Sequence, residues 1–293
     1  MTPEPPVLVT ADARIRRRRF VNRLMEALAT LAALAAVGVL ALMVGSVVKR
    51  GASALSLDLL TKTPVTFGET GGGLAHAFVG SAILVAVATL IAVPVGVLIA
   101  IYVSELAPRR LAMIVRLSLD VINGLPSIVI GIFIFSLIVV SHKQSGVAGS
   151  TALAIIMLPL VSRATQEMLL LVPPSLREAG FALGASRWRT VLGIVLPTSL
   201  GGIVTGTMLA VARAAGETAP LLFTSALTAN TVTIDPRQPL QSVPLSIFQL
   251  SESPDPADHA KAWAAALVLI TAVLVLSIVA RVLLVRSRRK LAR

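Results

Sequence analysis

Long apolar blocks recur along this chain of 293 residues, and short polar segments separate them. Each block holds about twenty or more residues, mostly Ala, Leu, Val and Ile, which is the length that crosses the hydrocarbon core of a bilayer as a helix. The short alternating segments of a transmembrane β-barrel are not seen. We therefore predict an all-α, polytopic helical bundle with six spans, at about 27–48, 77–103, 112–140, 151–172, 191–224 and 262–285.

The first block resembles a signal peptide as well as a span, because basic residues precede it and Ala52-Ser53-Ala54 follows it. It is longer than the core of about 7–15 residues that a signal peptide has. We therefore expect an uncleaved first transmembrane helix at 27–48 behind a basic tail at 1–26. The other five spans form a permease core over 77–285, before a basic tail at 286–293. The fifth block exceeds one straight span, so we expect its inner part to project from the membrane.

Composition excludes a soluble protein, because only 14% of the residues are charged and 56% are hydrophobic, whereas about a quarter of the residues of soluble domains are charged. The net charge of +12 could indicate nucleic-acid binding. The basic residues, however, lie at the ends of the apolar blocks, as the positive-inside rule requires. Most of them fall in the two tails and in the segments after spans two and four. We therefore expect membrane lipid and no nucleic acid as a partner, and both termini in the cytoplasm.

Several kinds of chemistry are not expected of this chain. It has no Cys, and its three His residues lie far apart without the spacing of metal ligands. It has no Gly-rich loop that ends in Gly-Lys-Ser/Thr, the motif that binds nucleotide phosphates. We therefore expect neither a cofactor nor a metal in the chain, and a transport subunit rather than an enzyme.

A helix–turn–helix elbow is predicted at 173–190, between spans four and five. Pro173-Pro174 ends span four, and Ser175 and Glu178 have the spacing of a capping box that starts a helix. Gly184 stands where that helix would end with a positive φ. Ser186 can then cap a second helix that runs into span five.

The first elbow helix has two predicted faces. Leu176, Ala179, Gly180 and Leu183 share one face by helical spacing. Arg177, Glu178 and Phe181 share the other, and an aromatic residue beside charges on an exposed helix favours a docking surface. The alternative is that Phe181 packs on the spans of its own chain while Glu178 only caps the helix. Spacing alone leaves both open.

Two ionisable residues, Arg213 and Glu217, lie inside span five. An Arg near the bilayer centre costs about 2.5–3.5 kcal/mol on insertion scales, so it must face the protein interior or a wet cavity. The pair is spaced i, i+4, and Gly216 and Pro220 weaken the helix around it. One hypothesis is that Arg213 attracts an oxyanion, whose geometry a guanidinium matches, while Glu217 prevents tight retention. The alternative is a structural ion pair that joins helices.

Other candidates carry weaker signals. Arg163, at the inner end of span four, serves the exit of a pathway or is an ordinary positive-inside residue. Arg116 and Asp120, spaced i, i+4, are interpreted as a structural pair. Asn123, one turn from Asp120, lines the pathway or bonds a neighbouring helix, and Thr218 is a further pathway candidate beside Glu217. The outer loop at 226–261 caps the pathway, meets a partner or only connects two spans.

The elbow carries a motif of known proteins. Glu178-Ala179-Gly180, then Gly184, then Ile194-x-Leu196-Pro197 resembles the "EAA" signature of ABC importer permeases, with Gly where Ala is commoner in the third position. The resemblance implies the type I permease architecture, in which the elbow is a coupling helix that fits a cleft on a separate ATPase subunit. It assigns the coupling role to the residues around the motif: Glu178, Ala179, Gly180, Phe181 and Gly184.

From about Ala77 onward, further strings are similar to the phosphate-specific importer permeases of the A type. They are Leu125–Gly131, Ser162–Thr165, Leu171–Pro173, Arg213–Pro220 and Ala262–Leu267, although two of the strings also occur in C-type permeases. The resemblance implies that Arg213 and Arg163 serve phosphate passage in a bacterial inner membrane. It also implies a C-type permease, an ATPase dimer that holds ATP and Mg, and an external phosphate-binding protein as partners.

The function expected from these features is phosphate import. Three alternatives remain at this stage: the same machine for sulfate or molybdate, an ATP-independent anion channel or exchanger, and a purely structural or sensory membrane subunit.

Overall fold

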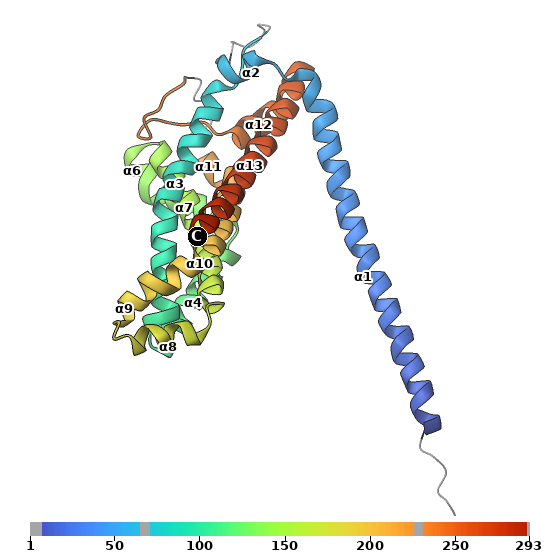
Figure 1. Ribbon diagram of the computed structural model, residues 1–293. Coiled ribbons are helices and arrows are strands. Elements are labelled where there is room, and N and C mark those ends of the chain that lie inside the picture. Colours follow the sequence, from blue (N-terminus) through green and yellow to red (C-terminus); the bar gives the residue numbers. More distant parts are fainter. Residues whose placement is uncertain (1–7, 65–70, 226–230, 292–293) are drawn as a thin grey trace, which may run out of the picture.

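The computed structural model describes residues 8–64, 71–225 and 231–291, and every regular element in these ranges is helical (Figure 1). The long helices are α1 (Leu8–Gly51), α3 (Ala75–Ile101), α4 (Arg109–Gly124), α7 (Gly146–Leu170), α10 (Leu196–Ala215) and α13 (Pro256–Leu291). The shorter ones are η1 (Ala52–Ala54), α2 (Leu57–Thr61), η2 (Tyr102–Leu106), α5 (Ser127–Ile134), η3 (Phe135–Val139), α6 (Val140–His142), α8 (Pro174–Ala182), α9 (Arg187–Thr190), η4 (Val191–Val195), α11 (Ala219–Thr224) and α12 (Val243–Ser251).

Within the described ranges, five helices are long and apolar enough to cross a membrane, and a bent pair supplies a sixth span. The pair is α4 with the helix at Ser127–His142, and the two are bent by 98°. The all-α bundle of six spans is thus confirmed, with the bent pair counted as one. The third span is not one straight helix, because Pro126 holds Leu125 in an extended conformation and ends α4 there.

The core of the bundle is the contact between α3 and α7, with α10 packed against α7. Ala88 and Ala92 on α3 and Leu153 and Met157 on α7 are fully buried in one cluster. Small residues let helices approach closely in a membrane, and Gly96 on α3 accordingly lies against the side chain of Val161. α7 is therefore the central helix, and it is the most buried of the candidate spans.

The segment that follows the undescribed residues 226–230 folds back onto the bundle. The backbone N–H of Val243 donates a hydrogen bond to Ser81 Oγ, and Gln241 lies 3.2 Å from the buried His76 ring. The apolar stretch from Pro244 onward forms α12, whose first turn is buried. This segment therefore belongs to the core of the bundle, on the side where α2 lies in Figure 1.

Helix α1 stands apart from the bundle in Figure 1 and contacts α13 near its own C-terminal end. There Gly51 lies against the backbone of Trp263, and the Arg50 guanidinium stacks 5.0 Å from the centre of the Trp263 ring. Only 6% of the apolar window of α1 is buried. This helix is thus held to the rest of the chain at one end.

Candidate functional site

The fifth span is broken where the sequence predicted weakness. Helix α10 ends at Ala215, Gly216 follows it, and α11 starts again at Ala219. The backbone N–H of Gly216 donates to the Arg213 carbonyl, and that of Glu217 donates to the Ala214 carbonyl. These bonds tighten the last turn of α10 and place both ionisable side chains at the break.

Arg213 and Glu217 form the predicted ion pair, with 3.5 Å between Arg213 Nε and Glu217 Oε1. The two side chains differ in exposure, since that of Glu217 is 15% exposed and that of Arg213 is 51% exposed. Among the described residues, no hydrogen bond occupies the Arg213 guanidinium. The carboxylate is thus packed against the protein, while the guanidinium keeps donors available for an anion.

The break in the fifth span lies beside the bend in the third. Arg213 lines a small cavity together with Asn123 at the end of α4 and Ser127 at the start of α5. Helices α5 and α11 touch at Gly131 and Pro220, and one turn further on Phe135 packs edge-on against Phe223. Two interrupted helices therefore meet around Arg213, as the discontinuous helices of many transporters do at their substrate sites.

Of the further candidates, Asn123 lies at the end of α4 and Thr218 lies in the break between α10 and α11. Asn123 shares the small cavity with Arg213, so the structure brings these two predicted pathway residues together. Thr218 is half-buried and immediately precedes α11, but its hydroxyl does not cap that helix. The positive N-terminal end of α5 also points into this region, since Ser127 lines the same cavity.

The predicted pairing of Arg116 with Asp120 is wrong. Asp120 forms an ion pair with Arg163 of α7, and both of these side chains are 47% exposed. The reason is the bend at Pro126, which lays α4 across α7 so that a partner on another helix reaches the carboxylate. Arg163 is therefore not an isolated positive-inside residue, and it does not line the cavity that holds Arg213 and Asn123.

The turn between the two elbow helices has the predicted form, but the first cap and the two predicted faces of α8 do not, since Leu176, Ala179 and Leu183 are exposed and only Gly180 of their face is buried. Gly184 adopts φ +77°, and the Ser186 hydroxyl accepts a hydrogen bond from the Arg189 backbone N–H, as expected. The capping box is wrong, because α8 begins at Pro174 and Ser175 makes no cap. Proline is favoured in the first turn because its missing N–H is one of the donors that a helix start leaves unpaired.

Helix α8 rests on the next segment through Gly180 and exposes larger side chains. A Cβ at position 180 would stand 3.0 Å from atoms of Thr190 and Ile194, which explains Gly at this position of the motif. The exposed fractions of Leu176, Phe181 and Leu183 are 40%, 46% and 87%. The alternative in which Phe181 packs on the spans of its own chain is therefore not supported, and we name Leu176, Glu178, Phe181 and Leu183 the elbow surface.

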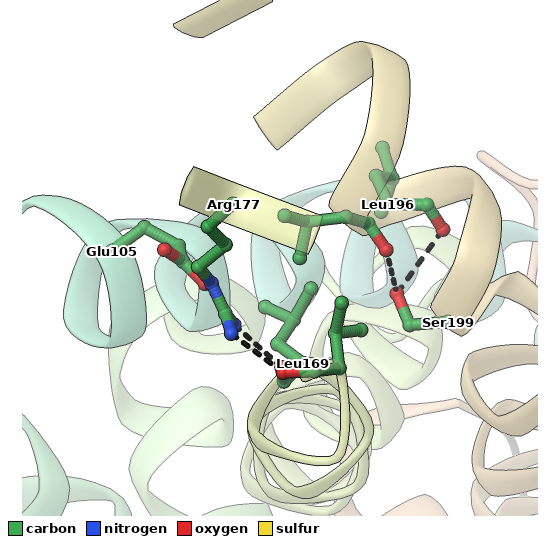
Figure 2. Close-up of polar contacts among 7 residues, drawn as sticks. Glu105, Leu169, Arg177, Leu196 and Ser199 are labelled. Carbon is green, nitrogen blue, oxygen red and sulfur yellow. Dashed lines mark hydrogen bonds and ion pairs between the residues drawn. The ribbon is translucent and has the colours of Figure 1, made fainter. Parts of the chain in front are cut away.

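Arg177 does not belong to the docking face that the spacing predicted. Its side chain turns inward, donates to the carbonyls of Val172 and Leu169, and pairs with Glu105 of η2 (Figure 2). The local sequence offered Glu105 another partner, Arg109, at i+4. Only the packing of η2 against α7 selects Arg177, so sequence reasoning missed Glu105 altogether.

Residues 92–292 match the family described as "Binding-protein-dependent transport system inner membrane component". This chain belongs to that family. Curated relatives are phosphate transport system permease proteins PstA. The protein of Yersinia pestis is 42% identical over 245 residues, which cover 83% of each chain. That of Haemophilus influenzae is 40% identical and covers 92% of this chain and 96% of its own. That of Pasteurella multocida is 41% identical, with 90% and 95% covered.

Two solved structures share the fold. An inward-facing structure of the MetNI methionine ABC transporter matches with a TM-score of 0.54 at 17% identity, over 75% of this chain and 95% of that chain. A bacterial ABC transporter that imports alginate matches with a TM-score of 0.52 at 14% identity, over 75% and 86%. These likenesses concern the fold alone, and they agree with the predicted architecture of an ABC importer permease.

Proposed function

We propose that this chain is the A-type permease subunit of an ATP-driven importer that moves inorganic phosphate into the cytoplasm. The observation that carries the proposal is Arg213, a half-exposed guanidinium held at the meeting point of two interrupted helices. The names of the relatives at about 40% identity support phosphate as the anion. The chain would work in a bacterial inner membrane, with both termini and the elbow in the cytoplasm.

The chemistry of the site suits a weakly held oxyanion. A guanidinium presents paired N–H donors to two oxygens of phosphate. Glu217, 3.5 Å from Arg213 Nε, would repel the same anion and thereby speed its release, because a conduit must bind weakly enough to let go. Asn123 and Thr218 would add neutral donors. Arg163, half-exposed beside Asp120, would serve the exit toward the cytoplasm.

Energy would come from outside this chain. ATP and Mg would bind to a dimer of ATPase subunits, and the elbow surface would fit against one of them. Leu176, Phe181 and Leu183 expose apolar area around Glu178 there, as a docking surface requires. A C-type permease would complete the pathway, and an external phosphate-binding protein would deliver the anion.

The test is uptake of radiolabelled phosphate into vesicles that contain the complete complex, with ATP on the ATPase side. We expect ATP-dependent uptake that excess unlabelled phosphate abolishes and that sulfate and molybdate leave intact. Arg213→Gln should lower uptake about tenfold or more, the effect of one lost charge-assisted contact. Arg237→Gln, at an exposed arginine of the outer loop, is the matched control.

Three outcomes would contradict the proposal. Competition by sulfate or molybdate as strong as that by phosphate would assign the importer to another oxyanion. Uptake that needs no ATP would indicate a channel or exchanger. Full uptake by Arg213→Gln would leave the charge in span five with a structural role only.

A further inference from the structure

One guanidinium, that of Arg177, joins three separate elements at the elbow end of the bundle (Figure 2). Nη1 donates to the Val172 carbonyl at 2.6 Å, and Nη2 donates to the Leu169 carbonyl at 2.8 Å. Nη2 also lies 2.8 Å from Glu105 Oε1. The side chains of Arg177 and Glu105 are 21% and 13% exposed, so water competes little for these bonds.

The three elements are the end of α7, the end of α3 and the start of α8. The last carbonyls of a helix have no partner within the helix and carry its negative dipole end, so a cation there is favourable. Arg177 therefore caps α7 from outside. Glu105 lies in η2, the wide turn that ends the span of α3. Since α3 and α7 form the main packing of the bundle, the bonds of Arg177 attach α8 to its central pair of helices.

The other attachment of α8 is of a different kind. Gly180 contacts Thr190 and Ile194 in the segment that leads into α10, and no hydrogen bond between side chains accompanies the contact among the described residues. At the start of α10, the Ser199 hydroxyl donates to carbonyls one turn earlier in the same segment, those of Val195 at the end of η4 and Leu196 (Figure 2). The link from α8 to α3 and α7 is thus polar and directional, whereas the link to α10 rests on van der Waals contact.

We infer that Arg177 is a positioning residue that makes α8, α7 and the end of α3 move as one rigid body during transport. A displacement of α8 at the elbow surface is then passed to the central pair of helices and, through the packing of α10 on α7, to the helix that carries Arg213. The inference rests on the proposed function and deepens it, because it names the joint between the ATPase-facing helix and the spans. A static role, in which Arg177 only stabilises the fold, is the alternative.

The test measures phosphate uptake per ATP hydrolysed by the complete complex in vesicles. We expect Arg177→Ala to retain the ATPase subunits and to hydrolyse ATP while its uptake per ATP falls about tenfold, since two carbonyl bonds and an ion pair are lost. Arg177→Lys, which can keep one or two of the contacts, should recover part of the ratio. Arg187→Ala removes an exposed arginine from the same elbow and is the matched control.

Uptake per ATP equal to that of the wild type in Arg177→Ala would overturn the inference. If Arg177→Ala cannot be recovered from membranes, Glu105→Gln decides, because it keeps the shape of the pair and removes one charge. A lower ratio in Glu105→Gln supports the joint, and an unchanged ratio overturns it. Absence of ATP-dependent phosphate uptake by the wild-type complex would instead refute the proposed function, so the two failures are distinguishable.

A second measurement tests the rigid body directly, because the chain has no Cys of its own. Glu105→Cys and Arg177→Cys, bridged by a short bifunctional thiol reagent, replace the polar link with a covalent one. We expect the bridged complex to transport better than the unbridged double variant. Loss of uptake on bridging would mean that the joint opens in each cycle, and would overturn the inference.

Discussion

Gly131 on α5 lies so close to Pro220 on α11 that a Cβ at position 131 would stand 2.7 Å from Pro220 Cα. Backbone meets backbone here, and neither element has a flexible side chain that could move aside. The contact holds the bend of the third span against the break of the fifth, and it thereby fixes the surroundings of Arg213. We expect both stability and transport to depend on it.

Gly131→Ala should destabilise the complex by about 1–3 kcal/mol, the usual cost of overpacking a closed contact. The measurement is the thermal unfolding midpoint of the purified complex, together with phosphate uptake. Gly38→Ala, in α1 with nothing within 4 Å of the added methyl group, is the control. Equal midpoints for Gly131→Ala and the wild type would show that the two breaks are not held together as described.

Glu217→Gln should make the site retain phosphate more tightly. Removal of the carboxylate 3.5 Å from Arg213 Nε removes the charge that opposes the anion, so the KM for phosphate is expected to fall about tenfold while the maximal uptake rate also falls. Initial uptake rates over a range of phosphate concentrations separate the two effects. A higher KM, or loss of the folded complex, would instead identify the pair as a structural ion pair.

The Asp120–Arg163 pair separates a structural role from a role in the pathway. Pairs that are this exposed contribute about 0–1 kcal/mol to stability, so Arg163→Gln should leave the thermal midpoint nearly unchanged. We expect its phosphate uptake to fall several-fold, while Asp120→Asn retains uptake because Arg163 keeps its charge. Arg116→Gln, on the same helix as Asp120, is the control. If Asp120→Asn and Arg163→Gln lower uptake equally, the pair acts only by joining α4 to α7.

The orientation of the bundle can be read with single cysteines on this Cys-free chain. Leu183, 87% exposed at the elbow, and Leu57, 76% exposed in α2, lie in segments that the topology places on opposite sides of the membrane. A thiol reagent that cannot cross membranes should label Leu57→Cys in intact cells and Leu183→Cys only in inverted vesicles. The reverse labelling pattern would show that the bundle has the opposite orientation in the membrane.

Features that depend on the chain within a few residues could be predicted from the sequence. The apolar blocks predicted the spans, and Gly184 predicted a residue with positive φ. The spacing of Arg213 and Glu217 predicted their ion pair. Gly216 and Pro220 also marked the break in the fifth span, whereas the 98° bend at Pro126 in the third span was not predicted. In each case the physical cause is local, so no knowledge of the neighbouring helices was needed.

Contacts between helices explain two predictions that failed, those for Asp120 and Arg177. Asp120 had a basic residue at the right spacing on its own helix, yet Arg163 reaches it from α7. Arg177 had the spacing of a docking face, yet the open carbonyls at the end of α7 and the carboxylate of Glu105 draw it inward. An ionisable side chain has several partners that sequence spacing allows. The angle at which two helices cross decides among them, and that angle follows from the packing of the whole bundle.

The stacking of Arg50 on Trp263 gives the chain an optical reporter. The chain contains two tryptophans, and the other one, Trp188, lies in the elbow at the opposite end of the bundle. In a Trp188→Phe variant, all indole emission would come from Trp263, at the contact between α1 and α13. A change in the emission wavelength or quenching of Trp263 when the other subunits bind would then reveal whether α1 separates from α13 during assembly.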